Sequence, residues 1–420
     1  MAERWLSELH VENFRSLRRV SLALGPVNVL VGPNGAGKSN VLEVFRFLAD
    51  IVRTDLRPAL EERGGFDRLV FRGGEVQPEH ISVGLQGNWS SPAEGHADEY
   101  ILTIHGEPLA REEVFRFGTQ RHRLRTIKIL DEVATAREVD VSEADELSDN
   151  VIRMGDHGGA VDSLSVDKEA SSVEKIGIQP LSSGLSTLPR LSSEGFSLGP
   201  MRVAAHLGTF RVFDVDVVRA SLPSRAPKSG AEGLWDDAAN LAGFLLWLRN
   251  RHGDAWNRLQ ADAVEVLPQL EALDFEHPSG ASHSVVLVLK ERGLRESTQL
   301  LDASFGTIRL LGLLAMLHDP DPPALTCVEE IDHGLHPQAL ELLVERVREA
   351  SERSQFIIAT HSPALVDRLK PEEIVICERG DDGASLIPAI STAKVEEIVR
   401  ASEGLPLGEL WFSGALGGDL

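Results

Sequence analysis

The chain is poor in cysteine, in long apolar runs and in positive charge. Its 420 residues include 2 cysteines, Cys327 and Cys377, and neither has a metal-ligand or CxxC partner nearby. So low a count excludes a disulfide framework and is typical of a reducing compartment. Apolar stretches such as Val27–Val31 and residues 310–317 are much shorter than a membrane span, and residues 1–10 lack the apolar core of a signal peptide. We therefore expect a cytoplasmic protein with no membrane contact.

Basic residues are outnumbered by acidic ones, 42 to 65, which gives a formal net charge of −23. The chain as a whole repels polyanions, so any contact with nucleic acid has to be focused in a basic patch or made through a partner. Residues 111–128 concentrate basic side chains and are the best local candidate for contact with DNA or RNA. A solvated charged surface is the alternative interpretation of this run.

The hydrophobic pattern predicts alternating strands and helices. Two short strands are expected within residues 6–24, a buried strand at Val27–Val31 and a helix at residues 40–51. Further strands are expected at residues 80–85, 100–105 and 285–289, and a further helix at residues 234–249. The last third alternates helix and strand, at residues 304–317, 324–328, 338–351, 355–359, 363–369 and 373–377. This alternation indicates a parallel sheet covered by helices.

The two ends of the chain are predicted to fold into one α/β head around an inserted lobe, with no internal repeat and no long coiled coil. We assign residues 1–105 and 281–420 to the head and residues 106–280 to a mixed lobe. Within that lobe, residues 131–197 are rich in acid, Ser and Gly and poor in aromatic residues. This composition predicts a segment that is partly mobile.

Residues 32–39, GPNGAGKS, match the phosphate-loop pattern G-x-x-x-x-G-K-[ST] in full, between a predicted strand and a predicted helix. Glycine lets successive backbone N–H groups point inward, and the following helix turns its positive end toward the phosphates. Lys38 is expected to bind the β- and γ-phosphates and Ser39 to ligate Mg²⁺. The motif therefore predicts binding of ATP with Mg²⁺. The residues assigned to ATP here are Asn34, Gly35, Gly37, Lys38, Ser39 and Asn40.

Two adjacent carboxylates, Glu329 and Glu330, end an apolar strand near the other end of the chain. Acids at the carboxyl edge of a parallel strand face the ligand crevice. We therefore expect Glu329 to hold Mg²⁺, directly or through water, and Glu330 to act as general base on the attacking water. His361 follows the next buried strand, a position that predicts a γ-phosphate sensor. Together with Lys38, Glu330 and His361 form the predicted catalytic set.

The order of these elements points to a family. After the phosphate loop come Ser304 and Gly306 at a helix start, then the strand with the paired Glu, then the strand that ends in Thr360 and His361. This order resembles that of the SMC-like ABC ATPases, and more closely that of the short AAA-type ATPases related to the OLD family and to anti-phage defence ATPases. The resemblance covers the two ends of the chain well and the middle poorly. It implies a P-loop NTPase head of the ABC/SMC type.

The resemblance also implies an assembly. Such ATPases form a homodimer or a higher even oligomer around nucleotide, in which Ser304 and Gly306 would reach the γ-phosphate bound by the partner chain. Arg15, in the first-strand motif, would lie near the nucleotide.

Two residues depart from the family pattern. Phe305 stands where a small or polar residue is common, and Glu329 replaces the usual aspartate. The resemblance does not settle which residue is the Q-loop glutamine, and Gln86 and Gln179 are alternatives.

Three functions are compatible with this sequence. The first is an ATP-hydrolysing dimer that regulates a separate nucleic-acid-directed effector in anti-phage defence or DNA repair. OLD-type relatives carry a nuclease domain after the final histidine, and too few residues follow His361 for such a domain. A nuclease effector is therefore expected to be a separate protein. The first alternative is a transporter-type ATPase subunit. Against it, the signature segment at residues 304–307 is followed by Ile308 and Arg309 and not by the Gln-rich continuation of transporters. The second alternative is a structural clamp that binds ATP with little turnover.

Overall fold

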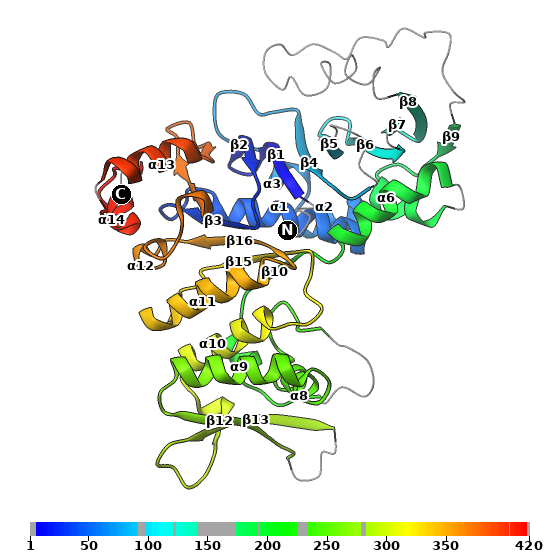
Figure 1. Ribbon diagram of the computed structural model, residues 1–420. Coiled ribbons are helices and arrows are strands. Elements are labelled where there is room, and N and C mark those ends of the chain that lie inside the picture. Colours follow the sequence, from blue (N-terminus) through cyan, green and yellow to red (C-terminus); the bar gives the residue numbers. More distant parts are fainter. Residues whose placement is uncertain are drawn as a thin grey trace.

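The computed structural model describes residues 6–90, 97–120, 123–140, 174–191, 194–225, 233–278, 283–402 and 404–417. Two large sheets lie in the upper part of Figure 1, and helices with a smaller sheet form the lower part. In the described part of the chain, no helix is both long enough and apolar enough to span a bilayer.

An eight-stranded antiparallel sheet has the strand order β2-β1-β4-β5-β6-β7-β8-β9. Most neighbours in this sheet are also neighbours in the sequence, joined as hairpins, so the sheet is built from local pairings. Its strands are β1 (Leu6–Phe14), β2 (Leu17–Ala23), β4 (His80–Gly87), β5 (Asp98–His105), β6 (Ala110–Gln120), β7 (Arg123–Leu130), β8 (Val133–Asp140) and β9 (Glu174–Gly177).

A five-stranded parallel sheet has the order β10-β15-β16-β3-β17. Alternate side chains of its central strands enter two different cores, as Ile357 and Ile358 do. Both faces of the sheet are therefore covered, which is why these strands are apolar along nearly their whole length. The strands are β3 (Val27–Val31), β10 (Arg211–Phe213), β15 (Leu325–Glu329), β16 (Gln355–Thr360) and β17 (Ile374–Ile376).

Helix α1 (Lys38–Arg53) lies between the two sheets (Figure 1). Its buried side chains share one core with Leu9 of β1 and Ile357 of β16. Val41 and Leu48 are both 0% exposed, whereas Arg46, on the polar side of this amphipathic helix, is exposed. Since α1 begins at Lys38, this burial anchors the end of the phosphate loop.

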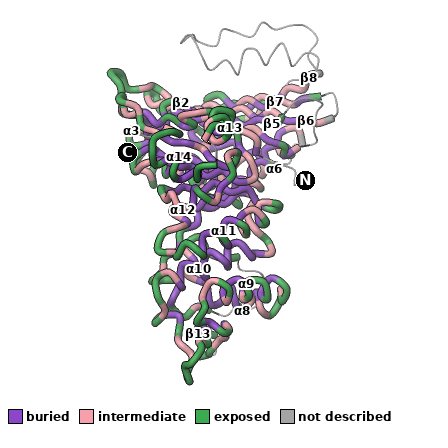
Figure 2. Tube along the Cα trace, turned by 60° about the vertical axis from the view of Figure 1, so that its left-hand side comes forward, coloured by how far each residue is buried: buried purple, intermediate pink, exposed green. Residues whose placement is uncertain are grey.

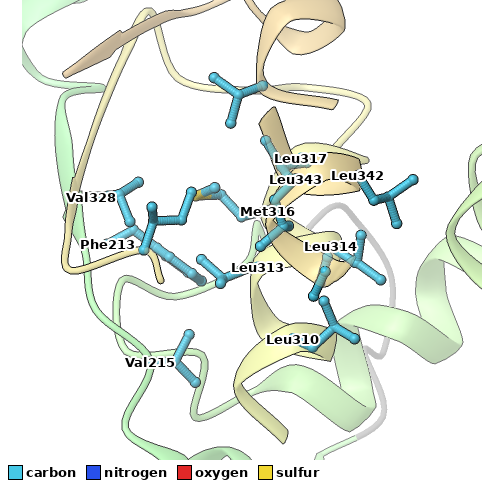
Figure 3. Close-up of a cluster of buried hydrophobic side chains, with 14 of the residues drawn as sticks. Phe213, Val215, Leu310, Leu313, Leu314, Met316, Leu317, Val328, Leu342 and Leu343 are labelled. Carbon is cyan, nitrogen blue, oxygen red and sulfur yellow. The ribbon is translucent and has the colours of Figure 1, made fainter. Parts of the chain in front are cut away.

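The other face of the parallel sheet is covered by α10 (Phe305–Leu317) and α11 (Pro337–Ala350). Figure 3 shows Leu313 and Met316 of α10 close to Phe213 of β10 and Val328 of β15. Buried residues run through the centre of the upper part and on into α10 and α11 (Figure 2). The same core continues into α8 (Leu241–Arg251), α9 (Gly253–Val266) and a small sheet of β11 (Ser224–Arg225), β12 (Leu270–Glu276), β13 (Ser284–Glu291) and β14 (Thr298–Gln299).

Short elements connect and flank these layers. Near the C-terminus, Trp411 is 2% exposed and belongs to the core under the parallel sheet, whereas the adjacent Phe412 is 66% exposed. The remaining elements are α2 (Leu56–Glu62), α3 (Phe66–Leu69), α5 (Gly184–Thr187), η1 (Leu188–Arg190), α6 (Glu194–Leu207), α7 (Val217–Ala220), η2 (Leu300–Asp302), α12 (Pro363–Val366), η3 (Pro371–Glu373), β18 (Glu378–Arg379), β19 (Ser385–Leu386), α13 (Thr392–Ala401) and α14 (Leu407–Phe412).

The predicted parallel sheet, with strands from both ends of the chain, is confirmed. The helix predicted at residues 234–249 begins only at Leu241. Residues before it form turns held by Asn240, whose side chain accepts a hydrogen bond from the Trp235 amide at 2.9 Å and donates to the Gly233 carbonyl at 3.0 Å. The strand predicted at residues 285–289 exists, as β13, but belongs to the small antiparallel sheet.

The sheets do not follow the expected division of the chain. The boundary at residue 105 falls inside the β5–β6 hairpin, and β10, expected in the inserted lobe, joins the parallel sheet beside β15. Of the segment 131–197, for which mobility is expected, residues 133–140 and 174–177 form strands and residues 184–190 form short helices. Residues 141–173 lie outside the described part of the structure.

Candidate nucleotide-binding site

The phosphate loop joins β3 to α1 along a backbone path that requires glycine. Gly35 and Gly37 have φ values of 84° and 101°, which residues with a side chain rarely adopt. A Cβ atom on Gly32 would lie 2.2 Å from the Cys377 carbonyl oxygen, and one on Gly37 would lie 2.0 Å from Ser385 Oγ. The loop is therefore held tightly against the segment that follows β17 and against β19.

Lys38 is buried inside this loop. Its ammonium group donates hydrogen bonds to the carbonyl oxygens of Gly32 at 2.7 Å and Pro33 at 2.9 Å. Burial lowers the pKa of Lys38, and the nearby carboxylates of Glu330 and Glu329 act in the opposite direction. The ammonium group is thus already among the loop carbonyls, where its N–H groups can exchange these acceptors for phosphate oxygens.

Ser39 and Glu329, the two predicted metal ligands, lie together. The Ser39 hydroxyl at the start of α1 donates a hydrogen bond to the Glu329 carboxylate at the end of β15. A pair of oxygen donors fits Mg²⁺, which keeps several waters and is usually completed by phosphate oxygens. Among the described residues, no group of three or more His, Cys, Asp and Glu side chains is arranged to hold a metal ion.

Glu330 lies directly after β15 in a strained conformation, with φ 48°. A residue with a side chain held in this region costs about 1–3 kcal/mol, and such strain is concentrated at functional sites. Its carboxylate lies between two imidazoles, with Oε1 3.5 Å from His361 Nδ1 and Oε2 3.8 Å from His333 Nδ1. The carboxylate is 42% exposed and therefore open to water. The structure thus brings Glu330 and His361 together, as the sequence predicts, and adds His333.

Arg309 is a site residue that the sequence motifs do not single out. It is 4% exposed, and its guanidinium donates to the carbonyl oxygens of Glu329 at 3.1 Å and Glu330 at 2.8 Å. It also donates to Asp214 at 3.3 Å. These contacts tie α10 to the segment that carries both carboxylates. A lone cation within an otherwise apolar helix is the signal that could have identified it.

A cavity of about 530 Å³ opens beside the start of α1. Arg15 and Asn40 both line it, and Asn40 donates to Ser16 Oγ at 2.7 Å. Arg15 also lies 3.7 Å from Glu43. Asn34 and Gly35 are exposed at the loop tip. Because four arginines line this cavity, it is suited to an anionic ligand; they are Arg15, Arg68, Arg72 and Arg379.

Ser304 is the N-cap of α10 and is exposed. Its Oγ accepts a hydrogen bond from the Thr307 amide at 3.1 Å. A Cβ atom on Gly306 would lie 2.6 Å from the Gly334 carbonyl oxygen, so glycine permits close approach of α10 to the loop after Glu330. Within one chain, Gly306 therefore packs against the loop that follows Glu330, and Ser304 is exposed to solvent.

The two alternatives for a Q-loop glutamine lie elsewhere. Gln86 lines a groove on the antiparallel sheet with His10 and Glu12. Gln179 follows β9, the last strand of that sheet, and is exposed. Gln86 belongs to the antiparallel sheet and Gln179 lies just beyond it, and neither is part of the phosphate loop.

In the described part of the basic run at residues 111–128, four of the cations are paired with carboxylates, and Arg123 is exposed. The run covers most of β6 and β7, where carboxylates of the same or neighbouring strands accompany the cations. Arg111 is only 2% exposed, and Arg121 lies outside the described residues. Because carboxylates neutralise four of the cations, the run is a poor docking surface for nucleic acid. The described ion pairs are Arg111–Glu113, Arg116–Glu99, Arg125–Glu138 and Lys128–Glu112.

Comparison with known families identifies the chain. The family described as "AAA domain, putative AbiEii toxin, Type IV TA system" matches residues 27–90 and 198–367. These segments are more than half of the chain and contain the phosphate loop, Ser304, the paired carboxylates and His361. The chain belongs to this family.

Relatives of this AAA-domain chain match it only locally. It is 46% identical to an OLD nuclease of Thermus scotoductus over 55 residues, which are 13% of this chain and 10% of that protein. It is 42% identical to the DNA replication and repair protein RecF of Paenarthrobacter aurescens over 84 residues, 19% of this chain and 20% of that protein. The matched segments thus span a small part of these relatives.

Among solved structures, a Pyrococcus furiosus Smc head domain bound to the C-terminal domain of ScpA aligns with 95% of this chain and 100% of its own, with a TM-score of 0.48 and 14% identity. The family match and the OLD nuclease confirm the predicted resemblance to AAA-type ATPases related to the OLD family.

Proposed function

We propose that the chain hydrolyses ATP as a homodimer with two shared nucleotide sites and thereby regulates a separate nucleic-acid-directed effector, in anti-phage defence or DNA repair. The observation that carries the proposal is the convergence, at one edge of the parallel sheet, of side chains that follow three strands far apart in the sequence. Lys38 and Ser39 follow β3, Glu329 and Glu330 end β15, and His361 follows β16.

Each of these side chains has a proposed part in hydrolysis. The phosphates of ATP would replace the two carbonyl acceptors of Lys38. Ser39 and Glu329 would hold Mg²⁺, which supplies charge neutralisation at the phosphates. Glu330 would orient the attacking water and accept its proton. His361, within 3.5 Å of the Glu330 carboxylate, would contact the γ-phosphate.

The second chain is proposed because Ser304 and the phosphate loop do not meet within one chain. Among the described residues, the Ser304 hydroxyl bonds to Thr307 alone, at the start of α10, a 13-residue helix whose N-terminus carries partial positive charge. In a two-fold dimer, the same surface of each chain can face the loop of its partner. We propose that Ser304 and Gly306 bind the partner's γ-phosphate, so that ATP favours the dimer and hydrolysis releases it.

The nucleic-acid-directed effector is proposed from the names of similar proteins and of the family. Its relatives are named as a nuclease and as a DNA replication and repair protein, and its family description refers to a toxin. Arg111, Arg116 and Arg125 of the basic run are ion-paired, which favours contact with nucleic acid through a partner over direct contact. The chain would then act as the ATP-controlled component.

The purified chain should release phosphate from ATP in the presence of Mg²⁺ and leave DNA and RNA intact. Phosphate release and nucleic-acid cleavage are measured in parallel, with the Lys38→Ala variant as the control for contaminating ATPases. Cleavage that persists at full rate in Lys38→Ala would contradict a separate effector. A wild-type chain that releases no phosphate would contradict the ATPase itself.

A further inference from the structure

Phe305 departs from the family pattern, and the structure gives its side chain a specific contact. Its ring lies against the imidazole of His333, with ring centroids 5.4 Å apart at an interplanar angle of 52°. The Phe305 side chain is nevertheless 45% exposed, so it is not a core residue. An aromatic side chain at the start of α10 thus contacts the loop that follows Glu330.

The backbone around this contact leaves the two rings little freedom. Gly334, next to His333, has φ 73°, and a Cβ atom there would lie 2.7 Å from two ring carbons of Phe305. Gly306, next to Phe305, approaches the Gly334 carbonyl so closely that a Cβ atom would lie 2.6 Å from its oxygen. Glycines on both sides therefore allow α10 and the loop to pack in direct contact, with Phe305 and His333 between them.

His333 in turn reaches the proposed base. Its Nδ1 lies 3.8 Å from Glu330 Oε2, and its amide donates to the Glu330 carbonyl at 3.0 Å. The other carboxylate oxygen of Glu330 faces His361 at 3.5 Å. In the described part of the chain, these two imidazoles flank the Glu330 carboxylate, and the Glu330 side chain is 42% exposed. Loss of either imidazole would let the carboxylate rotate away from the position of the attacking water.

We propose that Phe305 and His333 are positioning residues that hold the Glu330 carboxylate for proton abstraction. This inference rests on the proposed function, since it presupposes that Glu330 is the base. The tilted Phe305 ring packs against the imidazole, which would limit the rotation of the carboxylate. The aromatic residue that replaces a small or polar one in the signature segment therefore belongs to the hydrolytic machinery as a positioning residue.

The test is a steady-state comparison of ATP hydrolysis at protein concentrations where the dimer is saturated. Phe305→Leu, which keeps an apolar side chain and removes the ring, should lower kcat about ten-fold, because small misplacements of a catalytic group are costly, with KM within two-fold. His333→Ala should have a similar effect. The double variant should be no slower than the slower single variant, since both act through one contact.

Two further variants complete the experiment. Phe305→Tyr keeps the ring and should retain most of the wild-type kcat. Phe412→Leu makes the same substitution at a 66% exposed phenylalanine on α14 and should leave kcat unchanged. Since His333 is 61% exposed, His333→Ala tests the pair even where a Phe305 variant folds poorly.

Additive losses in the double variant would overturn the inference while leaving the ATPase intact. So would a rise in KM at unchanged kcat, or a Phe305→Tyr variant as slow as Phe305→Leu. A wild-type chain without ATP hydrolysis would instead overturn the proposed function, and this inference with it.

Discussion

Replacing Lys38 by alanine is expected to abolish ATP hydrolysis. Lys38 is the buried cation of the phosphate loop, and its ammonium group already lies against two loop carbonyls that phosphate oxygens would replace. A preorganised charge in a water-poor site acts on the transition state far more strongly than one in bulk water, and its removal costs on the order of 10²–10³-fold in kcat. The measurement is phosphate release over a range of ATP concentrations, with nucleotide binding followed by calorimetry.

Lys394→Ala provides the matched control for this prediction. Lys394 is 53% exposed on α13 and pairs only with Glu397, three residues along the same helix. The Lys394→Ala variant should therefore hydrolyse ATP like the wild type. Unchanged hydrolysis in Lys38→Ala, in a protein whose thermal melting shows it to be folded, would show that the loop does not hold the phosphates.

Replacing Glu330 by glutamine should stop hydrolysis and preserve nucleotide binding. Glutamine has nearly the same shape but cannot accept the proton of the attacking water, and loss of a general base costs typically 10²–10⁴-fold. Since Ser39 and Glu329 remain, Mg²⁺ and ATP should still bind. ATP that cannot be hydrolysed should then trap the dimer, so light scattering should give about twice the 45.8 kDa of one chain.

Glu341→Gln is the control for charge loss alone, because Glu341 is exposed on α11. It should hydrolyse ATP normally and form no trapped dimer. If the wild type hydrolyses nothing and Glu330→Gln changes nothing, the structural clamp becomes the better interpretation. If Glu330→Gln hydrolyses ATP slowly but stays monomeric in ATP, Glu330 remains the proposed base and the proposed dimer is contradicted.

Much of the head could be predicted from sequence because its signals are local. The strand at Val27–Val31 and the helix after it are framed by a motif of fixed spacing, so their positions follow directly. The alternation in the last third is equally clear, since β15 and β16 are apolar strands that end in polar residues, and α11 between them has apolar residues at helical spacing. The positions of Glu329, Glu330 and His361 at strand ends follow from the same pattern.

Other features depend on pairings between distant segments and could not be predicted. Strand β10 has 3 residues, too few for a periodic signal, and joins the parallel sheet only because β15 lies beside it. The boundary expected at residue 105 fails to match the sheets because β5 and β6 pair across it. The basic run looks like a patch in the sequence, yet Arg116 faces Glu99 across neighbouring strands. Charge compensation of this kind follows from strand register.

Contacts at the site are non-local in the same way. Arg309 of α10 contacts the carbonyl oxygens of Glu329 and Glu330 at the end of β15. Phe305 contacts His333 where Gly306 and Gly334 approach closely. Sequence spacing shows which residue types are present, but the distances between them arise from the packing of α10 on the parallel sheet.

Mixing two inactive variants tests the shared nucleotide site most directly. Lys38→Ala removes the phosphate-loop cation. Ser304→Asp keeps a good helix N-cap but places negative charge opposite the partner's γ-phosphate. Each variant should be inactive alone. A heterodimer contains one site with both Lys38 and Ser304 intact, so an equal mixture should recover roughly a quarter of the wild-type phosphate release if subunits pair at random. A mixture no more active than its separate components, or a fully active Ser304→Asp variant, would contradict two chains sharing each ATP.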